Sequence, residues 1–305
     1  MANASLHGAD GCINACYAVD HIPKWGASME LCGQTHQPPK ALSPPHHQAC
    51  HHTMPPVNSL PTHHSSRECT DLLSKHKANY TDYRTLRPEA FRAGLVKHPD
   101  RQFVSRVVKD VSEGVRIGYH GPQVTRICTN WPSAKKYDSH VSASIKRDVS
   151  LGRKLGPFSS PPSAIYVASP LGAFQKRSSA KVRVIHDLSY PRGRSINDFI
   201  SEKDSSVHYL SLDQVVSDIK KLGNHTLLAK ADLSDAFHHV LVHPDDWHLL
   251  GSVYVTNDNT YEFYVSTVLP FGLKSSPQKF TDIAMAAKFV MLYGGATYIQ
   301  QYLDD

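Results

Sequence analysis

The chain has 305 residues, of which 40% are hydrophobic and 20% charged, and its formal net charge is +6. This length is enough for about two domains with buried cores. No apolar run approaches the ~20 residues of a transmembrane helix, and residues 1–20 lack the basic and apolar regions of a secretory signal. The six cysteines form no C-x-x-C pair. We therefore expect an intracellular protein with reduced thiols and no membrane span.

Charge is distributed unevenly along the chain. Residues 1–79 are neutral and residues 80–134 carry a net +4, whereas residues 135–194 carry a net +9 and residues 195–305 a net −7. Such a basic block is suited to holding a polyanion, and the acidic block to gathering metal ions. Ordinary surface charge that clusters by chance is the alternative interpretation.

Residues 1–79 contain many Pro and His pairs and show neither helical nor strand periodicity. Such a segment cannot bury enough apolar surface to offset the entropy of ordering it, so we predict a disordered leader. Cys and His are also zinc ligands, but the spacing of Cys50-His51-His52 and Cys69 fits no familiar zinc finger. A metal-binding adaptor is therefore the weaker interpretation.

From residue 80 onward the sequence shows regular periodicity. Asp100 is expected to cap a helix whose buried face begins at Phe103 and which ends at Gly114. A second helix is expected over residues 142–155, followed by a strand over residues 164–168.

The next segments predict a hairpin, a helix and a strand. Residues 181–188 alternate as one arm of a hairpin whose turn is residues 176–180. Ser211 is expected to cap a helix that ends at Gly223. Its predicted buried face consists of Val215, Val216, Ile219 and Leu222. A strand that looks buried, residues 226–231, then leads into Asp232.

The last part of the chain predicts a hairpin, a long helix and a final strand. Residues 253–255 and 261–265 flank an Asn-Asp-Asn turn. Ser276 and a first-turn proline open the helix, which ends at two consecutive glycines. The final strand covers residues 296–303.

Three features of the acidic half point to chemistry. Asp232 ends a strand, residues 269–277 form a turn that leads into a helix, and Tyr302-Leu303-Asp304-Asp305 ends the last strand. Each feature alone is typical of a turn or a solvated terminus. Together, carboxylates at strand ends are what two-metal phosphoryl transfer needs, because Mg²⁺ prefers oxygen ligands.

These three motifs resemble the palm motifs of reverse transcriptases. The first is Asp-Leu-Ser-Asp-Ala-Phe at residues 232–237, the second Leu-Pro-Phe-Gly-Leu-Lys-Ser-Ser-Pro at 269–277, and the third Tyr-Leu-Asp-Asp at 302–305. Residues 181–189 and 191–198 resemble the fingers signature of the same enzymes. The resemblance covers about residues 85–305, and residues 1–79 match nothing we can name.

Three shorter segments are similar more narrowly to the DIRS group of tyrosine-recombinase retrotransposons. They are Gly-Pro-Phe at residues 156–158, Ser-Pro-Leu-Gly at 169–172, and the Pro-Arg-Gly-x-Ser-Ile-Asn-Asp run at 191–198. The resemblance thus indicates a retroelement reverse transcriptase.

The resemblance implies an α+β fold, with the fingers and partial palm of a right-hand polymerase built as an antiparallel sheet with packed helices. A disordered leader would occupy residues 1–79, the N-terminal helices and fingers residues 80–228, and a partial palm residues 229–305. A full-length element would add the rest of the palm, a thumb and an RNase H domain. Since the third motif ends the chain, we expect these 305 residues alone to be inactive or nearly so.

The resemblance also assigns roles to individual residues. Asp232, Asp304 and Asp305 would be catalytic and, with the backbone of Leu233, would hold two Mg²⁺ ions, for which Mn²⁺ is an alternative. Phe237 would block a ribose 2′-hydroxyl. The full set of expected nucleotide-binding residues is Lys176, Lys181, Arg183, Asp235, Ala236, Phe237, Phe271, Gly272 and Ser276.

The implied function is RNA-directed DNA polymerase, with an RNA template, a DNA primer and dNTPs as partners and no membrane. An RNA-dependent RNA polymerase is disfavoured by Phe237 and the Pro-Phe-Gly-Leu turn, and a non-catalytic nucleic-acid-binding remnant is the alternative from another class. We interpret the pairs His238-His239 and Asp245-Asp246 as turn and surface residues.

Overall fold

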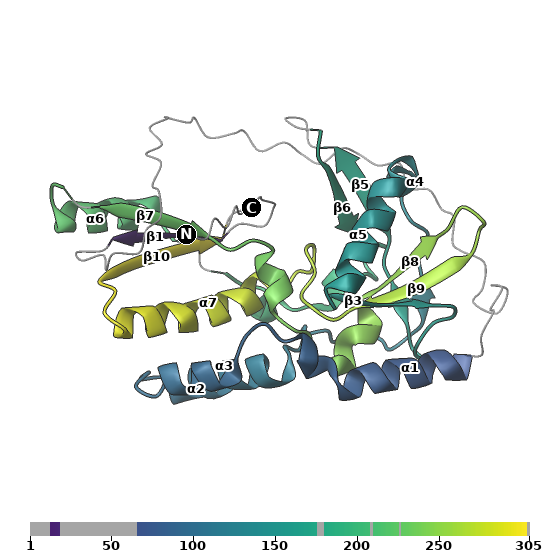
Figure 1. Cartoon of the computed structure of the whole chain (residues 1–305), viewed down its shortest axis with the longest axis horizontal. Coiled ribbons are helices and arrows are strands. Elements are labelled where there is room, and N and C mark those ends of the chain that lie inside the picture. Colours follow the sequence, from purple (N-terminus) through teal and green to yellow (C-terminus); the bar gives the residue numbers. More distant parts are fainter. Residues whose placement is uncertain (1–12, 19–65, 176–179, 208–209, 226, 304–305) are drawn as a thin grey trace, which may run out of the picture.

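The computed structural model describes residues 13–18, 66–175, 180–207, 210–225 and 227–303, and the structural statements below refer to these residues. The described chain is a mixed α/β structure with a five-stranded mixed sheet, a three-stranded antiparallel sheet and a two-stranded hairpin, packed against helices (Figure 1). Among these residues, no helix combines the length and the apolar character that crossing a bilayer requires.

Three helices run along one side of the molecule, at the bottom of Figure 1. They are α1 (Ser66–Ala78), α2 (Pro88–Gly94) and α3 (Arg101–Glu113). The prediction of a disordered leader over residues 1–79 is wrong for its last part. Residues 66–78 form helix α1, whose Cys69 and Leu73 are buried in the main hydrophobic core. The rest of that predicted leader, except strand β1 (Ile13–Ala18), lies outside the described residues up to residue 65.

Helix α3 confirms the predicted capping. The Asp100 carboxylate accepts a hydrogen bond from the Phe103 amide at 2.8 Å, which satisfies one of the free amides of the first turn. Gly114 ends the helix with φ +83°, a conformation that favours glycine. The apolar stripe of this helix is buried, and α3 thereby supports α7 (Ser276–Tyr293), which packs against it.

The five-stranded sheet has the order β2-β4-β8-β9-β3. Its strands are β2 (Arg126–Ile127), β4 (Val167–Ala168), β8 (Gly251–Val255), β9 (Tyr261–Ser266) and β3 (Lys154–Phe158). The pairs β2/β4 and β4/β8 are parallel, whereas β8/β9 and β9/β3 are antiparallel. The predicted hairpin around the Asn-Asp-Asn turn is thus confirmed, and the sheet is mixed where an antiparallel one was expected.

Two predicted elements of this region are wrong in extent. The helix expected over residues 142–155 is α5 (Asp138–Ser150), preceded by the short α4 (Pro132–Lys136). Residues 154 and 155 instead pair with β9, after Gly152 has turned the chain with φ +68°. The strand expected over residues 164–168 is only the two-residue β4. At residues 154 and 155, pairing with a distant strand overrode the local helical periodicity.

The predicted hairpin at residues 171–186 is present. Strand β5 (Leu171–Gln175) pairs with β6 (Val182–His186) in antiparallel register, and Phe174 lies opposite Arg183. Part of its turn, residues 176–179, lies outside the described residues. The hairpin packs beside α4 and α5, so its position depends on the same small core as those helices.

The three-stranded sheet has the order β10-β1-β7 and stands at the other end of the molecule (Figure 1). Strand β7 (Leu228–Asp232) and strand β10 (Tyr298–Leu303) both pair with β1. The prediction that the strand before Asp232 is buried is wrong, because every residue of β7 is exposed.

Helix α6 (Leu212–Leu222) has the predicted cap, with Ser211 accepting a hydrogen bond from the Asp213 amide, and the predicted end at Gly223. Its predicted buried face is wrong: Val216 is 41% exposed, whereas Asp218 is buried. Asp218 accepts hydrogen bonds from the side chains of Gln214 and of Gln300 on β10. A polar contact therefore joins α6 to the sheet.

Candidate active site

Asp232 and the end of β10 lie at the same edge of the three-stranded sheet. Because β1 runs antiparallel to both β7 and β10, these two strands run in the same direction and their carboxyl ends meet at one edge. Asn14 of β1 is in register with Asp232 on one side and with Tyr302 on the other. Two interstrand spacings separate the backbones of Asp232 and Tyr302, which is about 10 Å. Asp304 and Asp305 follow β10 directly and lie outside the described residues.

The segment after β7 turns sharply beneath this edge. Leu233 is 48% exposed, Asp235 has the left-handed conformation with φ +53°, and a 3-10 helix (Ala236–His239) follows. Asparagine and aspartate tolerate the left-handed region better than most residues, which explains Asp235 at this position. Ala236, one of the expected nucleotide-binding residues, is buried in the main hydrophobic core.

The Asp235 carboxylate is held by two arginines. Oδ2 accepts hydrogen bonds from Arg153 at 2.8 Å and from Arg147 at 3.1 Å. These arginines come from the loop before β3 and from the last turn of α5. Asp235 thus joins the turn after β7 to helix α5 and to the loop before β3.

Phe237 forms an aromatic cluster with the second motif. Its ring centroid lies 5.0 Å from that of Phe271 and 5.8 Å from that of Phe280 on α7. The ring of His238 contacts Phe271 edge to face at 5.1 Å. Burial lowers the pKa of His238 to about 4, with a further contribution from Arg153, so the imidazole is neutral at pH 7. Two of the sequence motifs are therefore in direct contact.

Asn197 fixes the turn that precedes α7. Its Nδ2 donates to the Gly272 carbonyl at 2.8 Å and to Ser189 Oγ at 2.9 Å, while its Oδ1 accepts from the Lys274 amide at 2.8 Å. Gly272 has φ +94°, and a Cβ there would lie 2.8 Å from the His186 carbonyl oxygen, so this position requires glycine.

Ser276 supports the same turn from inside. It is fully buried, and its hydroxyl donates to the Pro270 carbonyl at 2.9 Å. The neighbouring Ser275 donates to the Ile117 carbonyl at 2.8 Å. Helix α7 begins at Ser276 with proline in its first turn, so the predicted cap residue is the first helical residue and Ser275 precedes it.

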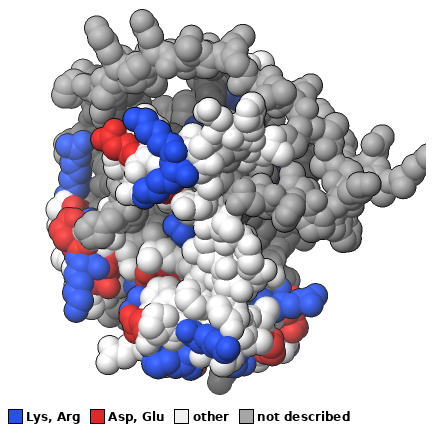
Figure 2. Space-filling model, turned by 90° about the vertical axis from the view of Figure 1, so that its left-hand side faces the viewer, with Lys and Arg blue, Asp and Glu red and all other residues white. Residues whose placement is uncertain are grey.

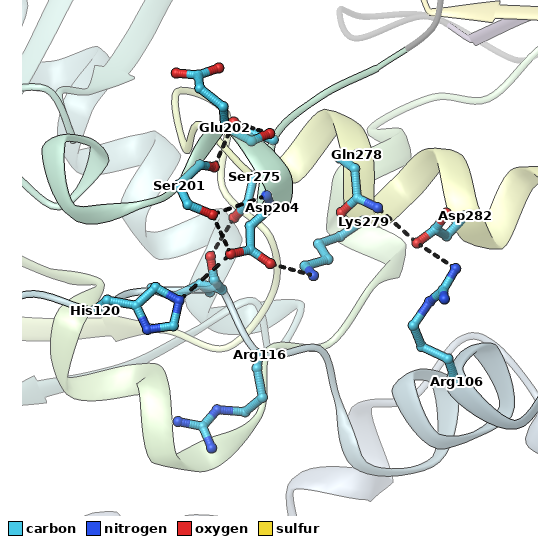
Figure 3. Close-up of polar contacts among 12 residues, drawn as sticks. Arg106, Arg116, His120, Ser201, Glu202, Asp204, Ser275, Gln278, Lys279 and Asp282 are labelled. Atoms are coloured by element: carbon cyan, nitrogen blue, oxygen red, sulfur yellow. Dashed lines mark hydrogen bonds and ion pairs between the residues drawn. The ribbon is translucent and has the colours of Figure 1, made fainter. Parts of the chain in front are cut away.

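A polar network joins the first turns of α7 to earlier parts of the chain (Figure 3). Asp204 lies between Lys279, with Nζ at 3.9 Å, and His120, with Nε2 at 3.7 Å. Further along the helix, Asp282 accepts a hydrogen bond from Gln278 and pairs with Arg106 of α3 at 3.5 Å. These contacts hold α7, and with it the turn that carries Phe271, against the N-terminal helices.

Two of the three expected basic residues, Lys181 and Arg183, lie at the second strand of the hairpin. Lys181 precedes β6 and is exposed, Arg183 lies on β6 and is half-buried, and Lys176 lies outside the described residues. Asp187, at the end of this strand, accepts hydrogen bonds from the Trp131 indole at 3.2 Å and the Ser189 amide at 3.1 Å. These contacts fix the orientation of Asp187 at the end of β6.

Asp246 is a correction to the sequence analysis, which interpreted it as a turn or surface residue. It is 4% exposed and accepts hydrogen bonds from Arg116 Nε at 2.9 Å, Arg116 Nη2 at 2.8 Å and the Ile117 amide at 2.9 Å. Its partner lies 130 residues earlier in the chain, so no local pattern could reveal the pair. The same is true of Arg147, Arg153 and Asn197, whose partners are also distant in sequence.

Among the expected metal ligands, Asp232 is the carboxylate that the structure describes at the shared edge. Its oxygens are the ligand type that a hard divalent cation prefers. Within the described part of the chain, no three His, Cys, Asp or Glu side chains gather as a metal site. A complete set therefore needs the two aspartates that follow β10.

A cavity of about 460 Å³ lies between α7 and β10. Met285, Phe289 and Leu303 are among its lining residues, and burial there lowers the pKa of Lys288. Figure 2 views this end of the molecule, where a broad uncharged area separates groups of charged side chains. The lining is largely apolar, so this cavity lacks the several charged groups that a triphosphate requires.

Residues 174–305 match the reverse transcriptase (RNA-dependent DNA polymerase) family. The matched region contains β6, Asp232, the turn before α7 and the final Tyr-Leu-Asp-Asp, so it includes all three motifs and the second strand of the β5/β6 hairpin. No curated protein matches the chain. The reverse transcriptase match implies RNA-dependent DNA polymerase activity, a nucleic acid template and primer, and dNTP binding.

Proposed function

We propose that this chain carries the fingers and part of the palm of a reverse transcriptase that extends a DNA primer on an RNA template. In this proposal residues 80–228 form the N-terminal helices and fingers, and residues 229–305 belong to the palm. The observation that carries the proposal is the shared edge of β7 and β10, which places Asp232 level with Tyr302. The family match over residues 174–305 supports the same assignment.

The proposed metal ligands are Asp232, Asp304 and Asp305. When bound, a pair of Mg²⁺ ions would lower the pKa of the primer hydroxyl and neutralise negative charge on the phosphates. Removal of any one carboxylate would leave too few anionic oxygens for two ions. Leu233 would add only backbone to the site, because its apolar side chain offers no ligand atom.

Around this edge, the chain's own residues would position the nucleotide. Backbone amides of the turn at residues 233–235 would bind phosphate oxygens, and the Phe237 ring, which contacts Phe271, would form a wall that excludes a ribose 2′-hydroxyl. Gly272 and Ser276 would act by shaping this wall. Arg183, with Lys176 and Lys181, would grip triphosphate oxygens from the hairpin, since a guanidinium offers paired donors to phosphate.

Template binding would involve the basic block. Residues 135–194 carry a net charge of +9 and include α5 and both strands of the hairpin. Binding driven by phosphate contacts releases counterions and therefore weakens steeply with salt, with little dependence on sequence. An RNA–DNA hybrid would be recognised mainly through its A-like shape.

The test measures the binding of a primer–template and then of a dNTP to the full chain. A fluorescently labelled RNA–DNA primer–template is titrated by anisotropy at several salt concentrations. Mg²⁺ and the next correct dNTP are then added, and the dissociation rate of the complex and any primer extension are recorded. Asp232→Asn is compared with Asp213→Asn, which makes the same charge change at an exposed residue of α6.

We expect the next correct dNTP to slow dissociation of the wild-type and Asp213→Asn complexes, and Asp232→Asn to abolish this effect without weakening hybrid binding. A non-catalytic nucleic-acid-binding remnant would instead bind the hybrid with the same salt dependence and show no dNTP effect in any variant. A preference for NTP over dNTP would favour an RNA-dependent RNA polymerase. Either result would contradict the proposal.

We also propose that the chain belongs to the DIRS group of retroelements. The support is the similarity of residues 156–158, 169–172 and 191–198 to that group. A tyrosine recombinase gene in the same genomic element would support this assignment, and an integrase gene of another type in its place would contradict it.

A further inference from the structure

Two arginines bind one carboxylate oxygen beside the proposed nucleotide site. Arg153 and Arg147 both donate to Asp235 Oδ2, at 2.8 and 3.1 Å. Their exposures differ widely, because 16% of the Arg153 side chain is exposed and 60% of the Arg147 side chain. Arg153 is therefore enclosed with its partner, whereas most of Arg147 faces solvent.

The cluster carries more basic than acidic groups. Besides Asp235, the nearby acidic residue is Asp148, whose pKa is raised mainly by burial, against the opposing effect of the positive charges of Lys154, Arg153 and Arg147. His238, which these arginines also face, is neutral at pH 7 because burial lowers its pKa to about 4. Three basic side chains thus face two acidic ones. Arg153 alone can neutralise Asp235, so Arg147 supplies positive charge beyond what this carboxylate requires.

This charge lies next to the turn that follows Asp232. Asp235 is in the left-handed conformation, and the 3-10 helix begins with the next residue. Successive backbone amides in a turn of this kind form a concavity suited to anions. An exposed guanidinium at the rim of such a turn could exchange one anionic partner for another, because phosphate accepts its paired donors as well as carboxylate does.

We propose that Arg147 binds a phosphate of the incoming nucleotide's triphosphate, leaving Asp235 to Arg153. This inference rests on the proposed function. Arg153 is then a positioning residue that holds the turn after β7, and Arg147 is the residue that touches substrate. Arg147 would act in addition to the basic residues of the hairpin.

The experiment uses the full chain, Mg²⁺ and inorganic tripolyphosphate, with dTTP on the primer–template as a second ligand, and measures affinity by titration calorimetry. Arg147→Gln is compared with Lys146→Gln, which removes the same charge from the adjacent exposed residue of α5. Arg147→Lys retains the charge but not the paired donors. Thermal unfolding of each variant shows whether the fold is retained.

We expect Arg147→Gln to weaken tripolyphosphate and dTTP binding about tenfold, the size of one charge-assisted hydrogen bond. Lys146→Gln should stay within about twofold of the wild type, and Arg147→Lys should recover part of the affinity. Affinity for the RNA–DNA hybrid without nucleotide should be unchanged in all three variants. The unfolding temperature of Arg147→Gln should stay near that of the wild type, because Arg153 still pairs with Asp235.

Three results would overturn the inference. Equal tripolyphosphate affinity of Arg147→Gln and the wild type would leave the proposed function intact but remove Arg147 from the site. Weaker hybrid binding by Arg147→Gln, with nucleotide affinity unchanged, would assign Arg147 to the nucleic acid backbone. Failure of the wild-type chain to bind either tripolyphosphate or dTTP would contradict both this inference and the nucleotide-binding part of the proposed function.

Discussion

Asn197 connects the fingers to the turn before α7, and Asn197→Asp tests that connection. The new carboxylate can still accept the hydrogen bond from the Lys274 amide. It cannot donate to the Gly272 carbonyl oxygen, which in the wild type lies 2.8 Å from Asn197 Nδ2. The bond to Ser189 Oγ survives, because the hydroxyl can turn to donate. One lost hydrogen bond costs about 1 kcal/mol, and repulsion between the carboxylate and the Gly272 carbonyl adds to it. The turn should therefore be less stable by about 1–2 kcal/mol.

Hydrogen exchange measures this loss locally. A destabilisation of 1–2 kcal/mol corresponds to about 5- to 30-fold faster opening, so amides of residues 271–276 should exchange faster by that factor. Asn257→Asp is the matched control, because Asn257 is exposed in the β8–β9 turn. In that variant the exchange of residues 271–276 should be unchanged.

Unchanged hydrogen exchange at residues 271–276 would show that Asn197 does not stabilise this turn. A uniform increase over the whole chain would also contradict the prediction, because that would show a global loss of stability rather than a local one. Asn197→Ala removes both contacts with the turn and should increase exchange further than Asn197→Asp does.

Three other predictions concern the buried Asp246, the ring of Phe237 and two buried histidines. Asp246→Ala should lower the free energy of unfolding in urea by about 2–3 kcal/mol, mainly because the buried Ile117 amide loses its acceptor. The loss of the Arg116 ion pair adds little, because the Arg116 side chain is 61% exposed and water can replace its partner. Phe237→Ala should reduce the preference for dTTP over UTP in primer–template complexes about tenfold, because the ring no longer walls off the 2′-hydroxyl. Burial lowers the pKa of His186 to about 3 and of His238 to about 4. Stability should therefore fall as pH is lowered from about 6.5 toward 4, because these imidazoles are protonated only in the unfolded chain.

Each of these has a contradicting outcome. A free energy of unfolding within 0.5 kcal/mol (roughly the effect of a surface substitution) of the wild type for Asp246→Ala would contradict the buried pair. An unchanged ratio of dTTP to UTP affinity would remove Phe237 from sugar selection. A double variant, His186→Asn with His238→Gln, should show a weaker pH dependence between pH 4 and 6.5. Equal pH dependence in this variant and the wild type would show that other groups control acid stability.

Local signals in the sequence were sufficient for several helix ends, although not for the ends of α5 or the cap of α7. Asp100 and Ser211 cap helices where expected, and Gly114 and Gly223 end them, because a cap depends only on residues within one turn of the helix. The hairpins and the order of the three motifs were also predicted from the sequence. The same local reasoning was wrong for residues 154–155, since pairing with β9 is a contact over more than a hundred residues.

What only the tertiary structure decided is which distant side chains meet. The sequence indicated Asp232 as a metal ligand, but the common edge of β7 and β10 depends on sheet order and strand direction. The buried pair of Arg116 with Asp246 and the contact of Arg147 with Asp235 likewise join segments that no periodicity relates. Periodicity reports which face of an element is apolar, whereas partner choice depends on how all the elements pack, and that is why the sequence alone could not supply these contacts.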